Sequence, residues 1–424
     1  MKAKVIKIFF SVVLLLGLSC KNEPTKTEHR AIKLTAEDAS CIEAWLRIEV
    51  WTKPSTVILQ KGDSTIATLQ LTTMDTVIVD EGLQPSQTYR YTAQLITPIP
   101  PVWLDDELSS QVEVRTMDTT SHDFRWEIYT LGDGTGSSCL YDVAIINDTL
   151  AYAVGEIYQD YNKDYQIYNA AKWNGRGWEL MRVPFVDQQG GQWITPIHSI
   201  FAFGPNDIWF EGGIHWDGTK FNSQPMNIEF PSHVNKLWGT SSRDLYAVGN
   251  NGLIAHYDGS RWRRIESGTK LNIYDIYGVS NEILAVASDI GVSFDRKILK
   301  VNGTSVISIN DSPITYCLQS IWFASNGYYY VVGDGIFRKK SLSENLWKSV
   351  SYDIFTTIRG NSRNDIFAAG IGGRIMHYNG VTWINYQGQT GLSACIYGSL
   401  AMKGNLVIGV GYNSNKGCVA IGRR

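Results

Sequence analysis

From about residue 31 onward, hydrophobic and polar residues alternate along the chain in short runs separated by Gly, Pro, Asn, Asp and Ser. Runs of this length and period are typical of antiparallel strands with one buried face. Beyond residue 20, hydrophobic residues do not recur at helical spacing over any length. The pattern therefore predicts an all-β chain. In its first part, the predicted strands span residues 41–51, 57–60, 65–71, 76–79, 89–95 and 111–115.

From residue 123 onward the alternation repeats with a period of roughly 40 residues, the range of four-stranded propeller blades. The clearest copies are KLWGTSSRDLYAVGNNGLIAHYDGSRWRRIESG from Lys236 and TIRGNSRNDIFAAGIGGRIMHYNGVTWINYQG from Thr357. Weaker copies start at residues 142, 199, 275, 320 and 398. Each reads as an apolar inner strand, a second strand ending at Gly, a third strand, and an outer strand that follows a Gly turn. The repeat predicts a β-propeller.

An Asn-Gly or Asp-Gly dipeptide marks the turn after the third strand in five of these copies. Asn-Gly and Asp-Gly tolerate positive φ at both central positions, so they predict two-residue type I′ hairpins. A Trp then starts the outer strand at Trp178, Trp262 and Trp383, where a large ring can seal one blade against the next. The five pairs are Asn174-Gly175, Asp217-Gly218, Asp258-Gly259, Asn302-Gly303 and Asn379-Gly380.

The two ends of the repeat region complement each other. The last copy ends at Arg424 without an outer strand, whereas residues 123–129 form a Trp-led strand without a blade of its own. We expect this N-terminal strand to complete the last blade, which would remove the exposed sheet edges of an open ring. Six complete blades and one shared blade give about seven. Six or eight blades remain open, because the copies at residues 275 and 320 are degenerate.

Residues 31–118 have the size of one β-sandwich. The segment GLQPSQTYRY at residues 82–91 places Leu83, Pro85 and Tyr89 at the spacing of the corner before strand F, and so resembles a fibronectin type III domain. In such domains the Tyr hydroxyl bonds to upstream backbone. The resemblance implies a spacer or adhesive module, with Trp45 or Leu46 in its core.

Residues 123–424 resemble a group of secreted bacterial propellers with WGTS, DVYAVG and HYDG-W elements, as in the copy from Lys236. They are similar, more distantly, to photosystem assembly-factor and sialidase-type propellers. The chain departs from these better-known families because it has neither an Asp-box nor a WD dipeptide at its blade ends. The resemblance therefore implies a fold and no particular activity.

The N-terminus reads as a targeting segment. Lys2, Lys4 and Lys7 precede a short apolar stretch, residues 8–18, and LGLSC at residues 16–20 resembles a bacterial lipobox. The resemblance implies acylation of Cys20 and anchoring in the cell envelope, at the outer membrane. An ordinary secretory signal with an incidental Cys is the alternative. The expected organisation is a signal peptide at 1–20, a tether at 21–30, a fibronectin type III-like domain at 31–118 and a propeller at 122–424.

Composition narrows the partners. The net charge is −3 and 19% of the residues are charged, so the chain lacks the excess of basic residues that nucleic-acid-binding proteins have. We expect a monomer. Five cysteines remain after Cys20, none at the CxxC spacing of zinc or redox sites, and one or two disulfides remain open. Cys139, Cys317 and Cys395 each lie five residues before the inner-strand position held by Trp238. Small residues fit there, so we read them as structural.

Ligand-binding loops of propellers gather on one face. The first copy carries the longest such loop, residues 156–168, whose Tyr and Asp residues suit a sugar or a protein partner. A long hairpin whose Tyr residues pack together would look the same. Trp193, His198 and the His215-Trp216 pair lie near that loop in the repeat frame. The candidate ligand-binding residues are Tyr158, Asp160, Tyr161, Asp164, Tyr165, Tyr168, Trp193, His198 and Trp216.

We find no catalytic constellation in the sequence: no nucleophile elbow, P-loop or HExxH, and no cofactor or metal motif. The sequence favours a lipid-anchored extracytoplasmic binding or scaffold protein that recognises a glycan or an envelope protein. A carbohydrate-active hydrolase or lyase with a site in the propeller mouth is the main alternative, and an envelope assembly factor is another. Acidic residues that converge with Arg or His in the central pocket would favour the enzyme.

Overall fold

The computed structural model describes residues 31–424 except 52, 97–106, 161–162, 164–166, 187–189, 225, 227–232, 292 and 326. The signal peptide, Cys20 and the tether that the sequence predicts lie outside the described residues. Within the described part, none of the helices is long and apolar enough to cross a membrane. Strands dominate, which confirms the all-β prediction. The chain divides into two compact units, described here in turn.

The first unit contains two antiparallel sheets. Because apolar and polar residues alternate along each strand, one face of each sheet is buried, as Val57 and Leu59 are in β3. One sheet has the order β1 (Ile32–Ala39), β2 (Glu43–Val50), β5 (Asp75–Glu81). The other has the order β4 (Ser64–Leu71), β3 (Ser55–Lys61), β6 (Thr88–Leu95), β7 (Ser109–Arg115).

The corner before β6 has its fully buried tyrosine two residues after the Tyr89 of the sequence motif. Leu83 is buried and Tyr89 is half-buried at the start of β6. Two residues on, Tyr91 is fully buried and its hydroxyl donates to the Asp80 carboxylate at 2.7 Å. Of the two expected core residues in β2, Leu46 is fully buried and Trp45 is half-buried on the other face.

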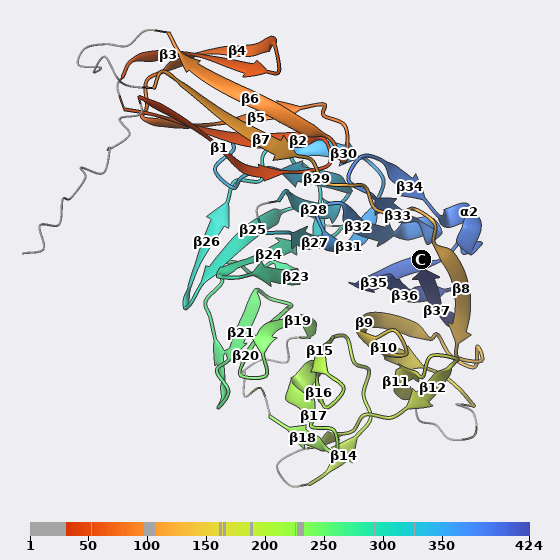
Figure 1. The fold of residues 1–424 in the computed structure, drawn as a ribbon. Helices are drawn as coiled ribbons and strands as arrows, with labels where there is room; N and C mark the ends of the chain where they lie inside the picture. Colours follow the sequence, from red (N-terminus) through yellow and green to blue (C-terminus); the bar gives the residue numbers. More distant parts are fainter. Residues whose placement is uncertain are drawn as a thin grey trace, which may run out of the picture. The chain divides into compact units, whose positions relative to one another are not determined.

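The second unit contains seven four-stranded antiparallel sheets among its described residues, and six of them follow the chain strand by strand. We name each sheet by its innermost strand (Figure 1). The six sheets are β9 (Cys139–Asn147), β10 (Leu150–Ile157), β11 (Tyr168–Trp173), β12 (Trp178–Met181); β15 (Ile200–Gly204), β16 (Asp207–Phe210), β17 (Ile214–Trp216), β18 (Phe221–Ser223); β19 (Val234–Ser241), β20 (Asp244–Gly249), β21 (Leu253–Tyr257), β22 (Trp262–Arg264); β23 (Asn272–Val279), β24 (Glu282–Ser288), β25 (Arg296–Asn302), β26 (Ser305–Ile309); β27 (Leu318–Phe323), β28 (Tyr329–Gly333), β29 (Gly335–Lys339), β30 (Lys348–Ser351); and β31 (Phe355–Ser362), β32 (Asp365–Gly370), β33 (Ile375–Tyr378), β34 (Trp383–Asn385).

The last sheet joins the two ends of this unit. Its order is β35 (Ile396–Lys403), β36 (Leu406–Asn413), β37 (Lys416–Arg423), β8 (Arg125–Leu131), so β8, which precedes the six other sheets in sequence, is the outermost strand of the last sheet. β8 pairs antiparallel with β37, with Trp126 opposite Gly422. The inner strands touch in succession from β9 to β35, and β35 touches β9, which closes the ring (Figure 1).

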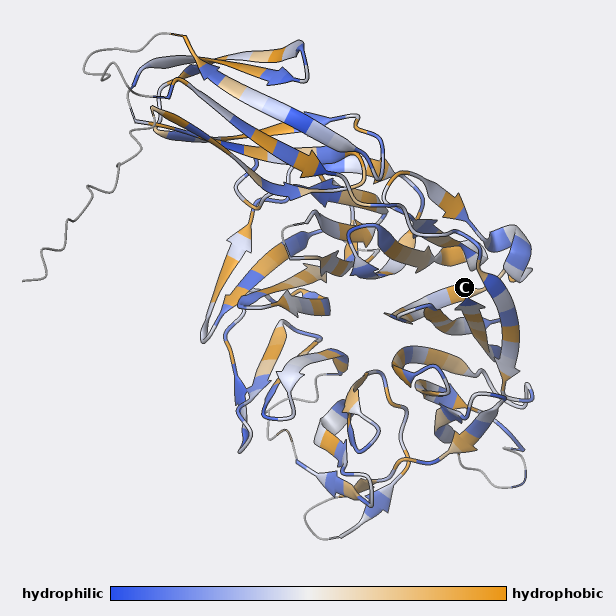
Figure 2. Cartoon of the chain, viewed as in Figure 1, coloured by the Kyte–Doolittle hydropathy of each residue, from blue (hydrophilic) through white to orange (hydrophobic). Residues whose placement is uncertain are grey.

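Short elements lie between these strands. A two-stranded hairpin, β13 (Phe185–Val186) and β14 (Gln192–Trp193), precedes β15. Two short 3-10 turns, η1 (Glu211–Gly213) and η2 (Ile371–Gly373), join second and third strands, and α2 (Gln387–Thr390) precedes β35. Hydrophobic residues recur along the strands of the ring (Figure 2) and pack between adjacent sheets.

The Gly that ends the second strand of a copy has a steric reason. A Cβ on Gly249 would lie 1.9 Å from the carbonyl oxygen of His233, which directly precedes the inner strand β19 of the same sheet. At the equivalent place within β36, a Cβ on Gly411 would lie 1.9 Å from the carbonyl oxygen of Ile396, the first residue of β35. The repeated Gly therefore lets the second strand approach the start of the first.

The predicted type I′ turns are wrong. At Asp258-Gly259 only Gly259 has positive φ, and the strands are separated by four residues. The Asp258 carboxylate instead accepts hydrogen bonds from the backbone N–H groups of Ser260 and Arg261, at 2.9 and 3.0 Å. Asn and Asp make such local bonds readily, so the pair marks a longer side-chain-capped turn. The same turn recurs at Asn174, Asp217 and Asn379.

Two of the cysteines left open by the sequence form a disulfide, Cys395–Cys418. Cys139 and Cys317 are free thiols at equivalent places, because their carbonyl oxygens face Gly155 and Gly333. At that place the β35 sheet has Ile396, so Cys395 lies one residue earlier than the repeat frame predicts. The disulfide therefore links the residue directly before β35 to Cys418 in β37.

Candidate functional site

The inner strands surround a central channel lined by three rings of side chains. Residues two apart on a strand point to the same side, so each inner strand offers a middle and a lower residue to the channel. The middle ring is Asp142, Ser199, Lys236, Asp275, Ser320, Thr357 and Ser399. The lower ring is Ala144, Phe201, Trp238, Tyr277, Trp322, Arg359 and Ala401.

The upper ring arises from β-bulges. In six of the inner strands the pairing with the second strand skips one residue directly before the middle ring, and a bulge re-aims the side chain of the skipped residue. His198 has this position in the β15 sheet by register. The upper ring is Tyr141, His198, Asn235, Tyr274, Gln319, Thr356 and Gly398.

Buried ion pairs hold the middle of the channel. Asp142 accepts the Lys236 ammonium at 2.6 Å, the Ser399 hydroxyl at 2.7 Å and the Val143 backbone N–H at 2.9 Å on one oxygen. Its other oxygen accepts the Ser199 hydroxyl at 3.2 Å and the Ile200 N–H at 3.1 Å. Both oxygens are therefore fully engaged.

The same arrangement recurs three sheets later. Asp275 accepts a two-pronged contact from the Arg359 guanidinium, at 2.8 Å to each oxygen. It also accepts the Ser320 hydroxyl at 2.5 Å and the N–H groups of Ile276 and Ile321, both at 3.0 Å. Burial alone would raise the pKa of Asp275, but the charge and hydrogen bonds of Arg359 lower it.

Acidic and basic groups do converge in the channel, the feature that would favour an enzyme. A general acid or base, however, needs a lone pair or proton within reach of a substrate. The oxygens of Asp142 and Asp275 are saturated by neighbouring strands, so these pairs act as clamps between the sheets. Below them lies a cavity of about 220 Å³ with an aromatic wall formed by Phe201, Trp238, Tyr277 and Trp322.

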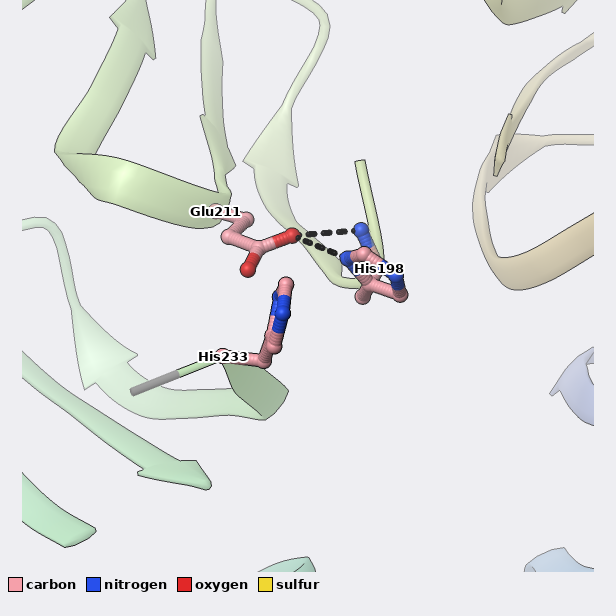
Figure 3. A group of neighbouring side chains, drawn as sticks. All are labelled: His198, Glu211 and His233. Atoms are coloured by element: carbon pink, nitrogen blue, oxygen red, sulfur yellow. Dashed lines mark hydrogen bonds and ion pairs between the residues drawn. The ribbon is translucent and has the colours of Figure 1, made fainter. Parts of the chain in front are cut away.

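One face of the ring carries the loops that join second to third strands and those that lead into the inner strands. We call it the loop face, and the opposite face the turn face. On the loop face, between the β15 and β19 sheets, lie His198, Glu211 and His233 (Figure 3). The Glu211 carboxylate accepts the His198 ring Nδ1 at 2.8 Å and the His198 backbone N–H at 2.6 Å through one oxygen. Its second oxygen accepts the Val234 N–H at 3.1 Å.

This group continues toward the first sheet. The Tyr141 ring stacks on His198 with 4.5 Å between centroids, and the Tyr141 hydroxyl donates to Glu156 at 2.8 Å. The Tyr158 hydroxyl reaches the other Glu156 oxygen at 3.4 Å. Burial alone would lower the pKa of His198, but the hydrogen bond and charge of Glu211, with the charge of Glu156, raise it. We call these six residues the polar cluster: Tyr141, Glu156, Tyr158, His198, Glu211 and His233.

The predicted ligand-binding residues separate into groups. Tyr158 and His198 are linked by Glu156 and Tyr141, because Glu156 accepts both tyrosine hydroxyls and the Tyr141 ring stacks on His198. Their positions in the repeat had predicted that they lie on the same face. Asp160 is exposed, and its carboxylate accepts a hydrogen bond from the Lys163 ammonium at 3.0 Å. Trp193, on β14, is 50% exposed. Tyr161, Asp164 and Tyr165 lie outside the described residues.

Tyr168 and Trp216 belong to the packing between strands. The Arg182 guanidinium lies 4.3 Å from the Tyr168 ring centroid. Trp216 packs on Phe221, with 4.9 Å between ring centroids. Its neighbour His215 bonds to Asp207 at 2.9 Å. Equivalent pairs recur as His256–Asp244 and His377–Asp365, at 2.7 and 2.9 Å, which identifies the His before the Gly turn as part of the repeat.

Sequence reasoning missed a row of exposed apolar residues on the loop face. They come from the loops of three consecutive sheets, β23, β27 and β31, and the most exposed are Tyr352 at 83% and Tyr316 at 53%. The Phe294 and Tyr316 rings touch edge to face, with centroids 6.3 Å apart. The sequence signal was present only as single apolar residues inside polar loops. We call this set the apolar row: Ile290, Phe294, Tyr316, Tyr352, Ile354 and Ile371.

No protein-family model and no curated protein sequence matches this chain. Among solved structures it is similar to YCF48 bound to D1 peptide, at 14% identity and a TM-score of 0.54, over 72% of this chain and 97% of that one. The WD40 β-propeller domain of Doa1 matches at 14% identity and a TM-score of 0.49, over 72% and 98% of the two chains. YCF48 from Cyanidioschyzon merolae matches at 12% and 0.47, over 71% and 98%. Together with the closed ring of four-stranded sheets, the first of these similarities identifies the repeat region as a β-propeller.

Proposed function

We propose that this chain is an extracytoplasmic binding protein that captures a protein partner on the loop face of its propeller. The apolar row carries this proposal. Soluble proteins rarely expose several large apolar side chains on neighbouring loops unless these residues meet a partner. Tyr, Phe and Ile are also the residue types that anchor protein interfaces.

The rest of the proposed organisation follows the sequence. Acyl chains on Cys20 anchor the protein at the outer membrane, and residues 31–118 act as a fibronectin type III-like spacer. Two facing sheets of three and four strands support the spacer assignment. The seven four-stranded sheets are the seven blades of the propeller, and β8 closes the last blade.

A protein partner suits the loop face better than a sugar. Glycan sites rely on a flat ring beside several free polar groups, and among the predicted residues that the structure describes, Trp193 is the one large exposed ring. The apolar row is instead mixed aromatic and aliphatic, spread over three sheets. One structural relative, YCF48, was solved bound to a peptide, which agrees with a peptide or protein ligand for this chain.

The test compares two triple variants of the full-length protein. Phe294→Ser, Tyr316→Ser and Tyr352→Ser together remove the centre of the apolar row. Ile307→Ser, Leu346→Ser and Ile384→Ser remove three exposed apolar residues elsewhere on the propeller. Each is screened against arrays of envelope-protein peptides and of glycans. We expect wild type and the second variant to bind the same peptides, and the first variant to bind them at least ~10-fold more weakly, about 1.4 kcal/mol.

Equal peptide binding by the two variants would contradict the proposal. So would binding to glycans alone that disappears when residues 158–168 are removed. The anchor is tested separately by membrane fractionation of wild type and Cys20→Ser. We expect the substitution to move the protein to the soluble fraction.

A further inference from the structure

Two histidines and one glutamate come together on the loop face from three separate segments. His198 precedes β15, Glu211 lies in η1, and His233 precedes β19 (Figure 3). One ligand atom from each of the three lies within 4.8 Å of the others. Imidazole nitrogen and carboxylate oxygen are the ligands that zinc and similar ions prefer. We propose that His198, Glu211 and His233 bind a divalent transition-metal ion.

The carboxylate is held in place before any ion arrives. Backbone N–H groups of His198 and Val234 each donate to one of its oxygens, at 2.6 and 3.1 Å. Such bonds orient a ligand and reduce the reorganisation that binding requires. Only a small movement of the His198 ring, now 2.8 Å from Glu211 through Nδ1, is needed to place an ion between them.

The turn that carries Glu211 is fixed by two glycines. Gly212 and Gly213 have φ values of 77° and 79°, and a Cβ on Gly213 would lie 2.0 Å from the Gln224 carbonyl oxygen. The equivalent turn of the β31 sheet, η2, has the same backbone, with Gly372 and Gly373 at 71° and 70°. That turn presents the apolar Ile371 where η1 presents Glu211. The fold therefore requires the turn but not the carboxylate.

The other histidines of the propeller are arranged differently. His215 and His256 each pair with one Asp within their own sheet. His377 is fully buried, and its two ring nitrogens contact Asp365 at 2.9 Å and His122 at 2.8 Å. Here two imidazoles from different sheets face one carboxylate, with 5.1 Å between ring centroids. His233 is exposed, so the group opens to solvent. Three protein ligands leave a coordination position for water or another ligand, as in open zinc sites.

The site requires no protein partner, so its test is independent of the proposed function. The full-length protein without a polyhistidine tag is stripped with a chelator and titrated with Zn²⁺ by calorimetry. We expect one equivalent to bind. Removing a ligand should weaken binding more than ~100-fold in His233→Ala and in Glu211→Gln, since even outer-shell substitutions cost 10–100-fold. Cobalt(II) should give a visible absorption band that the same variants lose.

His256→Ala is the matched control, because it removes a partly exposed histidine that pairs with Asp244 and does not belong to the group. We expect it to keep one equivalent of Zn²⁺. His233 is exposed, so its replacement should leave the thermal melt unchanged and keep the comparison interpretable. Two results would overturn the site: no Zn²⁺ binding by wild type at micromolar concentration, or wild-type affinity in His233→Ala.

Discussion

Replacing Arg359 by methionine should lower the free energy of unfolding by about 3–5 kcal/mol, the usual cost of leaving one partner of a buried ion pair uncompensated. The Arg359 and Asp275 side chains are 14% and 4% exposed. In the variant, the Asp275 carboxylate keeps its backbone donors but loses the cation that offsets its burial. Denaturant unfolding followed by tryptophan fluorescence measures the difference.

The pH dependence of this effect has a definite sign. In wild type the pKa of Asp275 is lowered from 3.8, so its contribution to stability is full above that value and is lost as the pH falls through the folded-state pKa. Without Arg359, burial raises the pKa of Asp275. As the pH falls, Asp275 is therefore protonated in the variant before it is in wild type, and protonation removes the uncompensated buried charge. The difference in the free energy of unfolding between wild type and Arg359→Met should therefore be largest near neutral pH and decrease as the pH falls.

Two further variants isolate the ion pair. Arg263→Met removes a guanidinium from the exposed pair with Asp258, whose side chains are 57% and 26% exposed, and should cost less than about 1 kcal/mol. Combining Arg359→Met with Asp275→Asn removes both charges and should recover part of the loss. If Arg359→Met cost no more than Arg263→Met, the channel pairs would not clamp the sheets.

The repeat made the strands of the propeller predictable, because alternation, the Gly that ends the second strand and the Trp of the outer strand recur at fixed offsets. Trp178, Trp262 and Trp383 do begin outer strands. The turn types were harder to predict. An Asp-Gly dipeptide occurs both in type I′ hairpins and in side-chain-capped turns, and the number of residues before the next strand decides between the two. β1 was missed because its alternation fades at residues 36–39, within a charged segment.

The candidate site was predictable only where the repeat shows which face a loop lies on. Tyr158 and His198 could be placed on one face from the repeat frame, because each follows or precedes a strand of known direction. The metal-binding group could not be found by spacing, since His198, Glu211 and His233 come from three segments on two sheets. The channel pairs were hidden for the same reason. Asp142 and Lys236 are 94 residues apart and meet only when the ring closes.

The second large loss of stability is expected where β8 closes the ring. Phe124 directly precedes β8, is 5% exposed, and contacts the rings of Phe367 and His377 at centroid distances of 5.0 and 5.3 Å. It thereby fixes the end of β8 against the core of the neighbouring β31 sheet. Phe124→Ala should lower the free energy of unfolding by about 3–5 kcal/mol, as large-to-small changes of buried Phe do.

Hydrogen exchange distinguishes weakened closure from a general loss of packing. If Phe124 holds β8 in place, the Ala variant should lose protection first in β8 and along the edge of β37 that pairs with it, while inner strands such as β19 stay protected. The matched control is Ile384→Ala, which truncates an exposed apolar residue on β34 of the β31 sheet and should cost less than about 1 kcal/mol. Equal costs for the two variants, or uniform loss of protection across all sheets, would mean that Phe124 does not hold β8 in place.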